Sequence, residues 1–505
     1  MQLNTDDINR FIGRFSLGRD SNPLNVTGSP HFLRIKIPGG LLDTKQFRRI
    51  AELARGYSRG QAEITNRQDI QLHWIDAKDA LDIFSIMDEM GFTTDMCGQG
   101  FSGARYGDAR NIVCCPVSGI DRNELLNGAA LLKKLSDFFI GNPDFQDMPR
   151  KFKFSISGCG CDCTRAVIND LAFVAVKKNE EIGYTLLAGG GIGASLPGPQ
   201  LAKPIYVFIK PEDAFTTAVA IIEIHRDYSS RESKSKARFK WLLHTWGLKK
   251  FLNTLEEKVG KRPEKYEGAA FIKNGEHEGV QSQKQKGYDY INVPLIGGTF
   301  TSDEMISLAN LADEYGNGKL RLTPTQNLII PYVEKKDTLL RRLEENGFQM
   351  RGSKLRWTSM GCASDFCGKT KTPHAKDLTK KIVDGLEKQF NIKWLNEAEF
   401  RIYISGCPNN CCANLIAEIG LAGKLAKVNG DPKQTYTLLL GGGFGTKLSL
   451  GRRVEVDVPA EKISSRIKSL LMNYFKEKEA SETLREFCNR CTQEDLKHFL
   501  TLPGD

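Results

Sequence analysis

Alternating apolar and polar positions predict two strands near the start of the chain, with a helix between them. Residues 33–37 alternate as a half-buried strand does, and residues 62–75 alternate again. Between them, residues 46–57 repeat their apolar positions at helical spacing. The pattern predicts a strand–helix–strand unit, which is followed by a second layer of mixed α/β structure.

This organisation occurs twice in the chain. The first matching block keeps a constant offset of 258 residues and begins with a pair of glycines in both copies. Three blocks recur in the same order, which indicates a duplicated unit with pseudo-twofold symmetry. The fold class that we expect is α+β, with mixed and antiparallel sheets and flanking helices. The matching blocks are 39–70 with 297–328, 154–163 with 402–411, and 184–193 with 436–445.

Composition places the chain among ordinary globular proteins with more than one domain. It has 505 residues, of which 40% are hydrophobic and 26% charged. No apolar run approaches the length of a membrane span, and the first residues lack the features of a signal or transit peptide, so we expect a cytoplasmic protein. The net charge of +10 favours anionic partners: nucleic acid, an acidic protein or an anionic substrate.

Four of the 13 cysteines form two close pairs in the second copy, Cys362-x₄-Cys367 and Cys407-x₃-Cys411. Four thiolates suit a 4Fe–4S cluster, while a structural zinc site and buried thiols remain alternatives. An odd number of cysteines in a long chain argues against a secreted disulfide framework.

The first copy keeps Cys159 and Cys163 at the equivalent place, with Cys161 between them and Cys114-Cys115 nearby. A second cluster on this set is the weaker alternative, because adjacent cysteines rarely both reach one metal. The remaining close pair, Cys488-x₂-Cys491, is interpreted as structural.

Cations are the other candidate chemistry of the first copy. Lys151 and Lys153 share one face of a strand, because alternate residues point to the same side. If the pseudo-twofold brings them, together with Arg67 and Arg110, beside the thiols, the four form a pocket for a small oxyanion. Any one of them alone would be interpreted as a surface charge. A basic helical stretch, residues 225–258, is interpreted as a solvated face.

Taken together, these motifs resemble the siroheme-dependent sulfite and nitrite reductase family over roughly residues 30–495. The resemblance implies that the second copy binds a 4Fe–4S cluster, and that the last cysteine also bridges to the siroheme iron. The implied cluster ligands are Cys362, Cys367, Cys407 and Cys411, with Cys411 shared. The implied anion-binding residues are Arg67, Arg110, Lys151 and Lys153. The implied siroheme-pocket residues are Gln68, Gly189, Gly190, Gly191, Gly441, Gly442 and Gly443.

The resemblance also implies a division of the chain. One departure from the family is the first cysteine pair, which is usually C-x₅-C and here is C-x₄-C, so the loop is one residue tighter. The expected regions are an N-terminal arm (1–28), a first ferredoxin-like half-domain (29–80), a first siroheme/Fe–S-type α/β domain (81–224), a basic helical connector (225–283), a second ferredoxin-like half-domain (284–340) and a second siroheme and 4Fe–4S domain (341–505).

The function implied is six-electron reduction of sulfite to sulfide, with electrons from reduced ferredoxin, an acidic protein that suits the positive net charge. Nitrite-preferring members often carry Asn where this chain has Lys153, and two lysines favour the sulfite dianion. The alternatives are a ferredoxin-nitrite reductase and a related cluster-containing oxygenase of corrinoid synthesis, which would not need the Lys151/Lys153 pair.

Other classes explain less of the sequence. A basic nucleic-acid-binding protein with zinc hooks would not account for the duplication, and a dissimilatory reductase is disfavoured because no C-x₂-C-x₂-C run is inserted. We expect no nucleic-acid or membrane partner.

Overall fold

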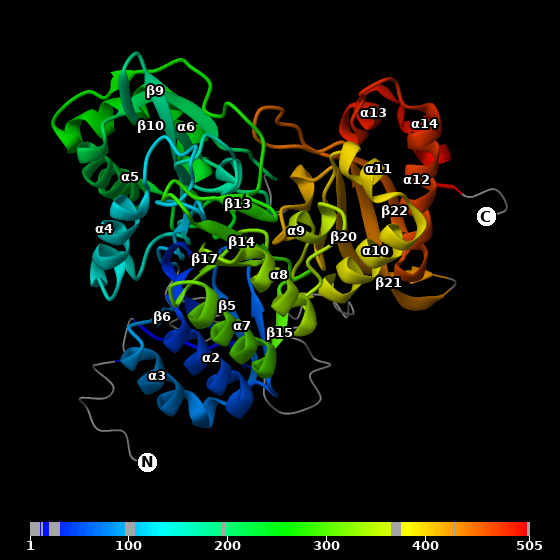
Figure 1. Cartoon of the computed structure of the whole chain (residues 1–505). Helices are drawn as coiled ribbons and strands as arrows, with labels where there is room; N and C mark the ends of the chain where they lie inside the picture. Colours follow the sequence, from blue (N-terminus) through cyan, green and yellow to red (C-terminus); the bar gives the residue numbers. More distant parts are fainter. Residues whose placement is uncertain are drawn as a thin grey trace.

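The computed structural model describes residues 11, 14–19, 31–95, 107–193, 198–364, 375–428 and 430–501. Figure 1 shows three parts. The two strand–helix–strand units together form one part, called the body, and each repeat also contributes one α/β lobe. The sheets mix parallel and antiparallel pairing and have helices packed against them, so the prediction of a duplicated α+β fold is confirmed. Among the described helices, none combines the length and the apolar character needed to cross a bilayer.

The elements of the body recur at the offset of 258 residues found in the sequence. Both long helices begin with a capping box, in which the N-cap side chain and the third helical residue bond each other's backbone. Residues 62–75 form two strands separated by a turn, not one continuous strand. The first copy contains β2 (His31–Lys36), β3 (Leu41–Asp43), α2 (Thr44–Tyr57), β4 (Gln61–Ile64), β5 (Ile70–Ile75), α3 (Ala80–Glu89) and β6 (Thr93–Thr94). The second contains β13 (Val280–Ser282), β14 (Asp289–Val293), β15 (Thr299–Thr301), α7 (Ser302–Tyr315), β16 (Lys319–Leu322), β17 (Leu328–Val333) and α8 (Lys336–Glu345).

The two copies exchange one strand each. Strand β15 pairs with β4 of the first copy, and β3 pairs with β16 of the second. The resulting sheets run β1-β2-β5-β4-β15 and β13-β14-β17-β16-β3, where β1 is Gly18–Arg19. Buried side chains of both copies form one continuous hydrophobic core. The body is therefore a single packed unit, because neither sheet is complete without the other repeat.

Two equivalent glutamines join the copies at their centre. Gln68 Nε2 donates to the carbonyl of Leu322 (2.8 Å), and Gln326 Nε2 donates to the carbonyl of Ile64 (3.1 Å). Both glutamines are buried and adopt left-handed backbone conformations, with φ of 63° and 65°. Because each pair is the pseudo-twofold image of the other, the symmetry read from the sequence extends to individual hydrogen bonds.

Each lobe begins with parallel strands and ends with an antiparallel meander. The sheets run β12-β11-β10-β9-β8-β7 and β18-β19-β20-β21-β22. The first lobe contains β7 (Val113–Cys114), α4 (Ala129–Phe139), β8 (Phe154–Ser157), β9 (Leu171–Lys178), β10 (Glu181–Ala188), β11 (Lys203–Ile209), α5 (Ala214–Tyr228), α6 (Phe239–Val259) and β12 (Glu264–Lys265). The second contains α9 (Leu355–Thr358), β18 (Met360–Gly361), α10 (Ala375–Gln389), α11 (Ile392–Glu397), β19 (Ile402–Ser405), β20 (Ile419–Val428), β21 (Asp431–Leu440), β22 (Arg452–Pro459), α12 (Ile463–Glu477), α13 (Leu484–Arg490) and α14 (Gln493–Phe499). Parallel pairing of β7 with β8, and of β18 with β19, brings the loops that follow these strands to one edge of each sheet.

A buried ionic network joins the two lobes. Glu276 accepts hydrogen bonds from Arg165 of the first lobe (2.5 Å) and from Arg401 of the second (2.6 Å). Arg401 also pairs with Glu418 (2.8 Å), and both guanidinium groups lie over the ring of Phe444. Because each charge has an opposite partner, the network can remain in a low-dielectric interface.

The basic stretch 225–258 differs from its prediction. It is not one helix, because residues 229–238 separate α5 from α6. Nor is all of its charge on the surface: Arg238 pairs with the buried Asp170 (2.7 Å), and Lys240 Nζ donates to the carbonyl of Gly191 (2.8 Å). These two cations hold α6 against the first lobe.

We expect His225 to make the protein less stable in mild acid. Its imidazole is buried between the Ser229 hydroxyl (2.7 Å) and the Arg150 carbonyl (2.9 Å), and burial lowers the pKa of His225 from 6.5 to about 4. The unfolded chain therefore binds a proton at higher pH than the folded protein does. The stabilisation is complete above pH ~6.5 and falls by about 3 kcal/mol as the pH drops towards ~4.

Urea unfolding of wild type and His225→Gln, followed from pH 7.5 to 4.5, measures this effect. The slope of stability against pH should be smaller in the variant, because glutamine does not titrate. Equal slopes in the two proteins would contradict the assignment.

Candidate active site

Two predicted cluster ligands lie side by side at the edge of the second lobe. Cys362 follows β18 and Cys407 follows β19, and these strands are parallel neighbours. The backbone N–H of Gly406 donates to the Cys362 sulfur (3.1 Å). Such N–H···S bonds are one of the ways in which proteins tune iron–sulfur centres. Cys367 lies outside the described residues.

Cys411 lies at the end of the same loop, exposed, and is held from two sides by the first copy. Asn66 donates to the Cys411 carbonyl (2.6 Å), and Asn410 donates to the carbonyl of Ile192 (2.8 Å). The loop that carries Cys407 and Cys411 is thus seated against the turn after β4 and against the first glycine loop.

The predicted arginines lie in the first copy on the same side. Arg67 is in the turn after β4 and donates to the Asn169 side chain (2.9 Å) and to the Asn111 carbonyl. Its Nε is buried and has no hydrogen-bond partner among the described residues. Arg110 lies beside Asp108, with 3.2 Å between Nε and the carboxylate.

Lys151 and Lys153 flank Phe152, whose ring packs into the core of the first lobe, so both ammonium groups share the other face. Burial, reinforced by Arg238 and Arg110, lowers the pKa of Lys151 to about 8. Burial, together with Arg67 and Lys151, lowers the pKa of Lys153 well below its ordinary value. The Cys411 thiolate opposes both shifts.

The charged groups that act on Lys151 and Lys153 are mostly cations. Among the described residues, no carboxylate forms an ion pair with Lys151 or Lys153, and the charged groups that influence them include four arginines. Buried like charges raise one another's energy, and an anion placed between them would remove that cost. The structure therefore brings Lys151 and Lys153 near the predicted arginines and Cys411, and their role in anion binding stays a prediction.

Comparison with known proteins agrees with this architecture. A family model described as the nitrite and sulphite reductase 4Fe-4S domain matches residues 106–263 and 353–501. A second, described as the nitrite/sulfite reductase ferredoxin-like half domain, matches residues 27–90 and 281–346. The chain belongs to the nitrite and sulfite reductase family.

Relatives in this family carry the names of both activities. The chain is 29% identical to a ferredoxin–nitrite reductase of Leptolyngbya laminosa, over 89% of this chain and 88% of that protein. It is 28% identical to the sulfite reductase [ferredoxin] 2 of Mycolicibacterium paratuberculosis, over 95% and 85%. The solved structure of the Mycobacterium tuberculosis NirA protein is similar, with a TM-score of 0.86, 26% identity and coverage of 98% of this chain and 92% of that chain. The chain is accordingly an oxidoreductase of the sulfite/nitrite reductase type.

The cofactors of this enzyme type are siroheme and a 4Fe–4S cluster, and the residues present fit them. Cys362, Cys407 and Cys411 would supply thiolates to the cluster from one edge of the second lobe, and the Gly406 N–H donates to the Cys362 sulfur. The Arg67 Nε, buried without a partner among the described residues, suits a carboxylate of siroheme or an oxyanion.

Gln68, a predicted siroheme-pocket residue, is hydrogen-bonded to the backbone of both copies. Both N–H bonds of its side-chain amide go to carbonyls of Gly39 and Leu322, and its oxygen accepts from the Cys114 N–H. The side chain is completely buried and its hydrogen-bonding groups are used within the protein. Gln68 thereby shapes the turn that carries Arg67, and its contact with siroheme stays a prediction.

The glycine loops are close-packed against their own lobes. A Cβ at Gly190 would lie 2.4 Å from the Asn169 carbonyl oxygen, and one at Gly442 would lie 2.5 Å from that of Ala417. Glycine at these positions is required by backbone packing in both copies. Contact of siroheme with the loops Gly189–Gly191 and Gly441–Gly443 stays a prediction.

Several residues of this site were not predicted. Arg238 adds positive charge beside the lysines, while the buried Asp170 pairs with it and accepts the Lys153 backbone N–H (3.0 Å). Asn66 and Asn169 position the Cys411 loop and Arg67. Because these partners lie far apart in sequence and follow no motif, only Arg238 carried a signal, as part of a basic stretch.

Proposed function

We propose that this enzyme is an assimilatory, ferredoxin-dependent sulfite reductase that reduces sulfite to sulfide with six electrons, and that nitrite is its second substrate. The observation that carries the proposal is the pair of half-buried lysines, Lys151 and Lys153, which lie near the predicted arginines and Cys411. Two lysines suit the doubly charged sulfite better than the singly charged nitrite. When bound, siroheme and the cluster supply the iron site and the electrons.

In this proposal, the arginines and the lysines of the site have different roles. Arg67 and Arg110 keep their charge and orient the oxyanion through forked hydrogen bonds. Lys151, with a pKa of about 8, holds the anion and can still give up its proton near neutral pH. Each loss of oxygen as water consumes two protons, and the proposed role of the lysines is to help deliver them.

Reduced ferredoxin is the proposed donor. Relatives named for both activities carry ferredoxin in their names, and the net charge of +10 favours an acidic partner. Arg238 and Lys240 are used inside the protein, so a docking surface for ferredoxin would draw on the exposed charges of the stretch, such as Arg231, Lys234 and Lys236.

Steady-state reduction of sulfite and of nitrite, with reduced ferredoxin or viologen, tests the proposal. The ratio of kcat/KM for sulfite to that for nitrite should fall on the order of 10-fold in Lys153→Asn, since one charged contact to the dianion is lost. Lys177→Asn, on an exposed lysine of the same lobe, is the matched control. An unchanged ratio would contradict the role of Lys153, and a wild type without sulfite turnover would contradict the function.

A further inference from the structure

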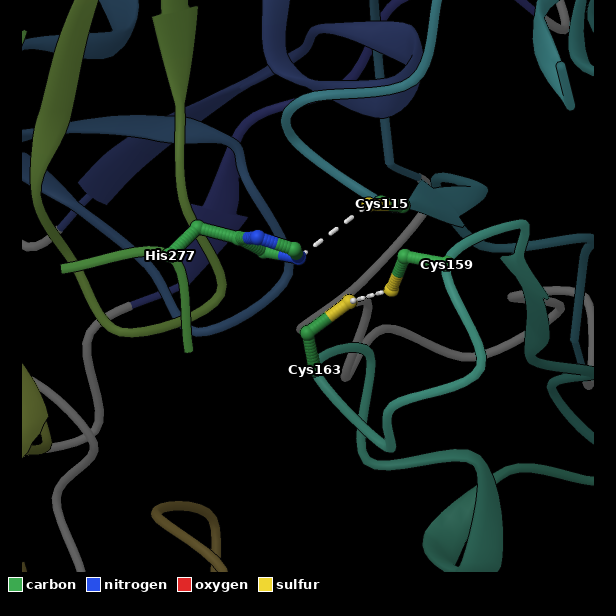
Figure 2. A group of neighbouring side chains, drawn as sticks. All are labelled: Cys115, Cys159, Cys163 and His277. Carbon is green, nitrogen blue, oxygen red and sulfur yellow. Dashed lines mark hydrogen bonds between the residues drawn. The ribbon is translucent and has the colours of Figure 1, made fainter. Parts of the chain in front are cut away.

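The first repeat contains a second group of converging thiols. Cys115, Cys159 and Cys163 point towards one another and towards His277, as Figure 2 shows. The four ligand atoms all lie within 4.8 Å of one another. Cys159 and Cys163 are 3.5 Å apart at their sulfurs, and the Cys115 sulfur is 3.4 Å from His277 Nε2. All four side chains are buried.

Three of these residues occupy the positions of the cluster ligands in the other copy. Cys115 follows β7 and donates its N–H to the Ile156 carbonyl (2.9 Å), as Cys362 follows β18 and donates to the Ile404 carbonyl (3.0 Å). Cys159 and Cys163 correspond to Cys407 and Cys411. The first copy therefore does possess a partner for its C-x₃-C pair, contrary to the expectation from its sequence.

Adjacent Cys114 and Cys115 do not compete for this site. The Cys114 side chain belongs to the hydrophobic core of the first lobe, whereas Cys115 lies in a separate buried cluster with Cys159 and Cys163. The fourth ligand comes from outside the repeat: His277 lies in the segment between α6 and β13. The first copy thus retains three thiols and has gained an imidazole.

The backbone holds His277 in place at a conformational cost. His277 adopts a left-handed conformation with φ of 60°, which non-glycine residues rarely do. Asn292 on β14 donates to its carbonyl (2.9 Å), and Ile272 donates to the carbonyl of Gly160 in the cysteine loop (3.1 Å). Asp121 lies 3.9 Å from His277 Nδ1, on the side away from the thiols. A carboxylate behind a ligating imidazole is the usual outer shell of a metal site.

We propose that Cys115, Cys159, Cys163 and His277 bind one zinc ion. Three cysteines and one histidine are a known tetrahedral zinc set, and zinc–sulfur bonds of about 2.3 Å place the ligand atoms about 3.8 Å apart. The spacings in this group agree with one central ion. A 4Fe–4S cube would bind each ligand to a different iron and requires a wider arrangement.

The ion would join three parts of the molecule. The cysteines belong to the first lobe, His277 to the segment between the repeats, and Asn292, which holds that segment, to the second half of the body. Glu276, next to His277, is the centre of the ionic network between the lobes. Zinc at this site would fix the relative position of the lobes that form the active site.

Metal analysis and zinc X-ray absorption of the purified holoenzyme test this proposal. We expect about one zinc per chain, bound by three sulfurs and one nitrogen, in addition to the iron of siroheme and one cluster. Cys159→Ser and His277→Ala should each lower the zinc content at least about 10-fold, while siroheme absorption is retained.

Cys161→Ser is the matched control, because Cys161 is buried in the same loop but its sulfur is not among the four converging atoms. It should keep its zinc. Wild-type protein without zinc, four additional irons that depend on Cys159, a Cys159–Cys163 disulfide in the native enzyme, or equal zinc loss in Cys161→Ser would each overturn the proposal. The wild-type measurement decides the matter even if a ligand variant fails to fold.

Discussion

Cys411→Ala is expected to remove siroheme-linked absorption and to lower sulfite turnover by more than about 100-fold. Outer-shell partners of metal sites already contribute about 10–100-fold to affinity or activity, and a direct ligand should contribute more. Cys411 lies at the exposed end of the loop that begins with Cys407, and it is near enough to oppose the lowering of the pKa values of Lys151 and Lys153. The visible spectrum, iron content and viologen-dependent activity of the purified variant measure the effect.

The neighbouring cysteine supplies the control. Cys412 is buried in the apolar contact between the lobes, and burial raises the pKa of its thiol, so it should remain a neutral packing residue. Cys412→Ser should retain the spectrum and most of the activity. If Cys411→Ala behaved like Cys412→Ser, the assignment of Cys411 as a ligand would be wrong.

Arg401→Ala is expected to destabilise the protein by about 3–5 kcal/mol. Arg401 neutralises Glu276 and Glu418, whose side chains are only 1% and 4% exposed. Removing the guanidinium would take away the ion-pair partner of the buried Glu418 carboxylate, and Glu276 would keep its ion pair with Arg165. Urea unfolding of the holoenzyme measures the loss.

A surface ion pair of the same lobe is the matched comparison. Lys424 and Asp457 are 2.7 Å apart, but their side chains are 44% and 42% exposed. Solvent screening limits such a pair to about 1 kcal/mol or less, so Lys424→Ala should change stability little. Equal losses in the two variants would show that burial adds nothing to the network around Arg401.

The duplication could be recognised from the sequence because the features that recur in both copies are local patterns. Helix and strand periodicity, paired glycines and the C-x₃-C motif each lie within a few residues, and all recur in both copies. The offset of 258 residues predicted where the elements of the second copy begin. Strands β2 and β5 and helix α2 each have a counterpart that begins at that distance.

The tertiary structure decided which groups meet. Strands β3 and β15 each pair with the other repeat, since both copies together bury more apolar surface than either alone. The side-chain amide of Gln68 bonds to carbonyls of both copies, and no local pattern in the sequence indicates these contacts.

Contacts between segments that are distant in the sequence were also decided by the tertiary structure. Arg238 with Asp170, and His277 with the three thiols of the first lobe, join residues that no spacing relates. The sequence by itself therefore determined the repeat, the secondary structure and the types of chemistry. Only the packing of one copy against the other decided where the cations converge and where a second metal could bind, because contacts across a pseudo-twofold leave no periodic trace along the chain.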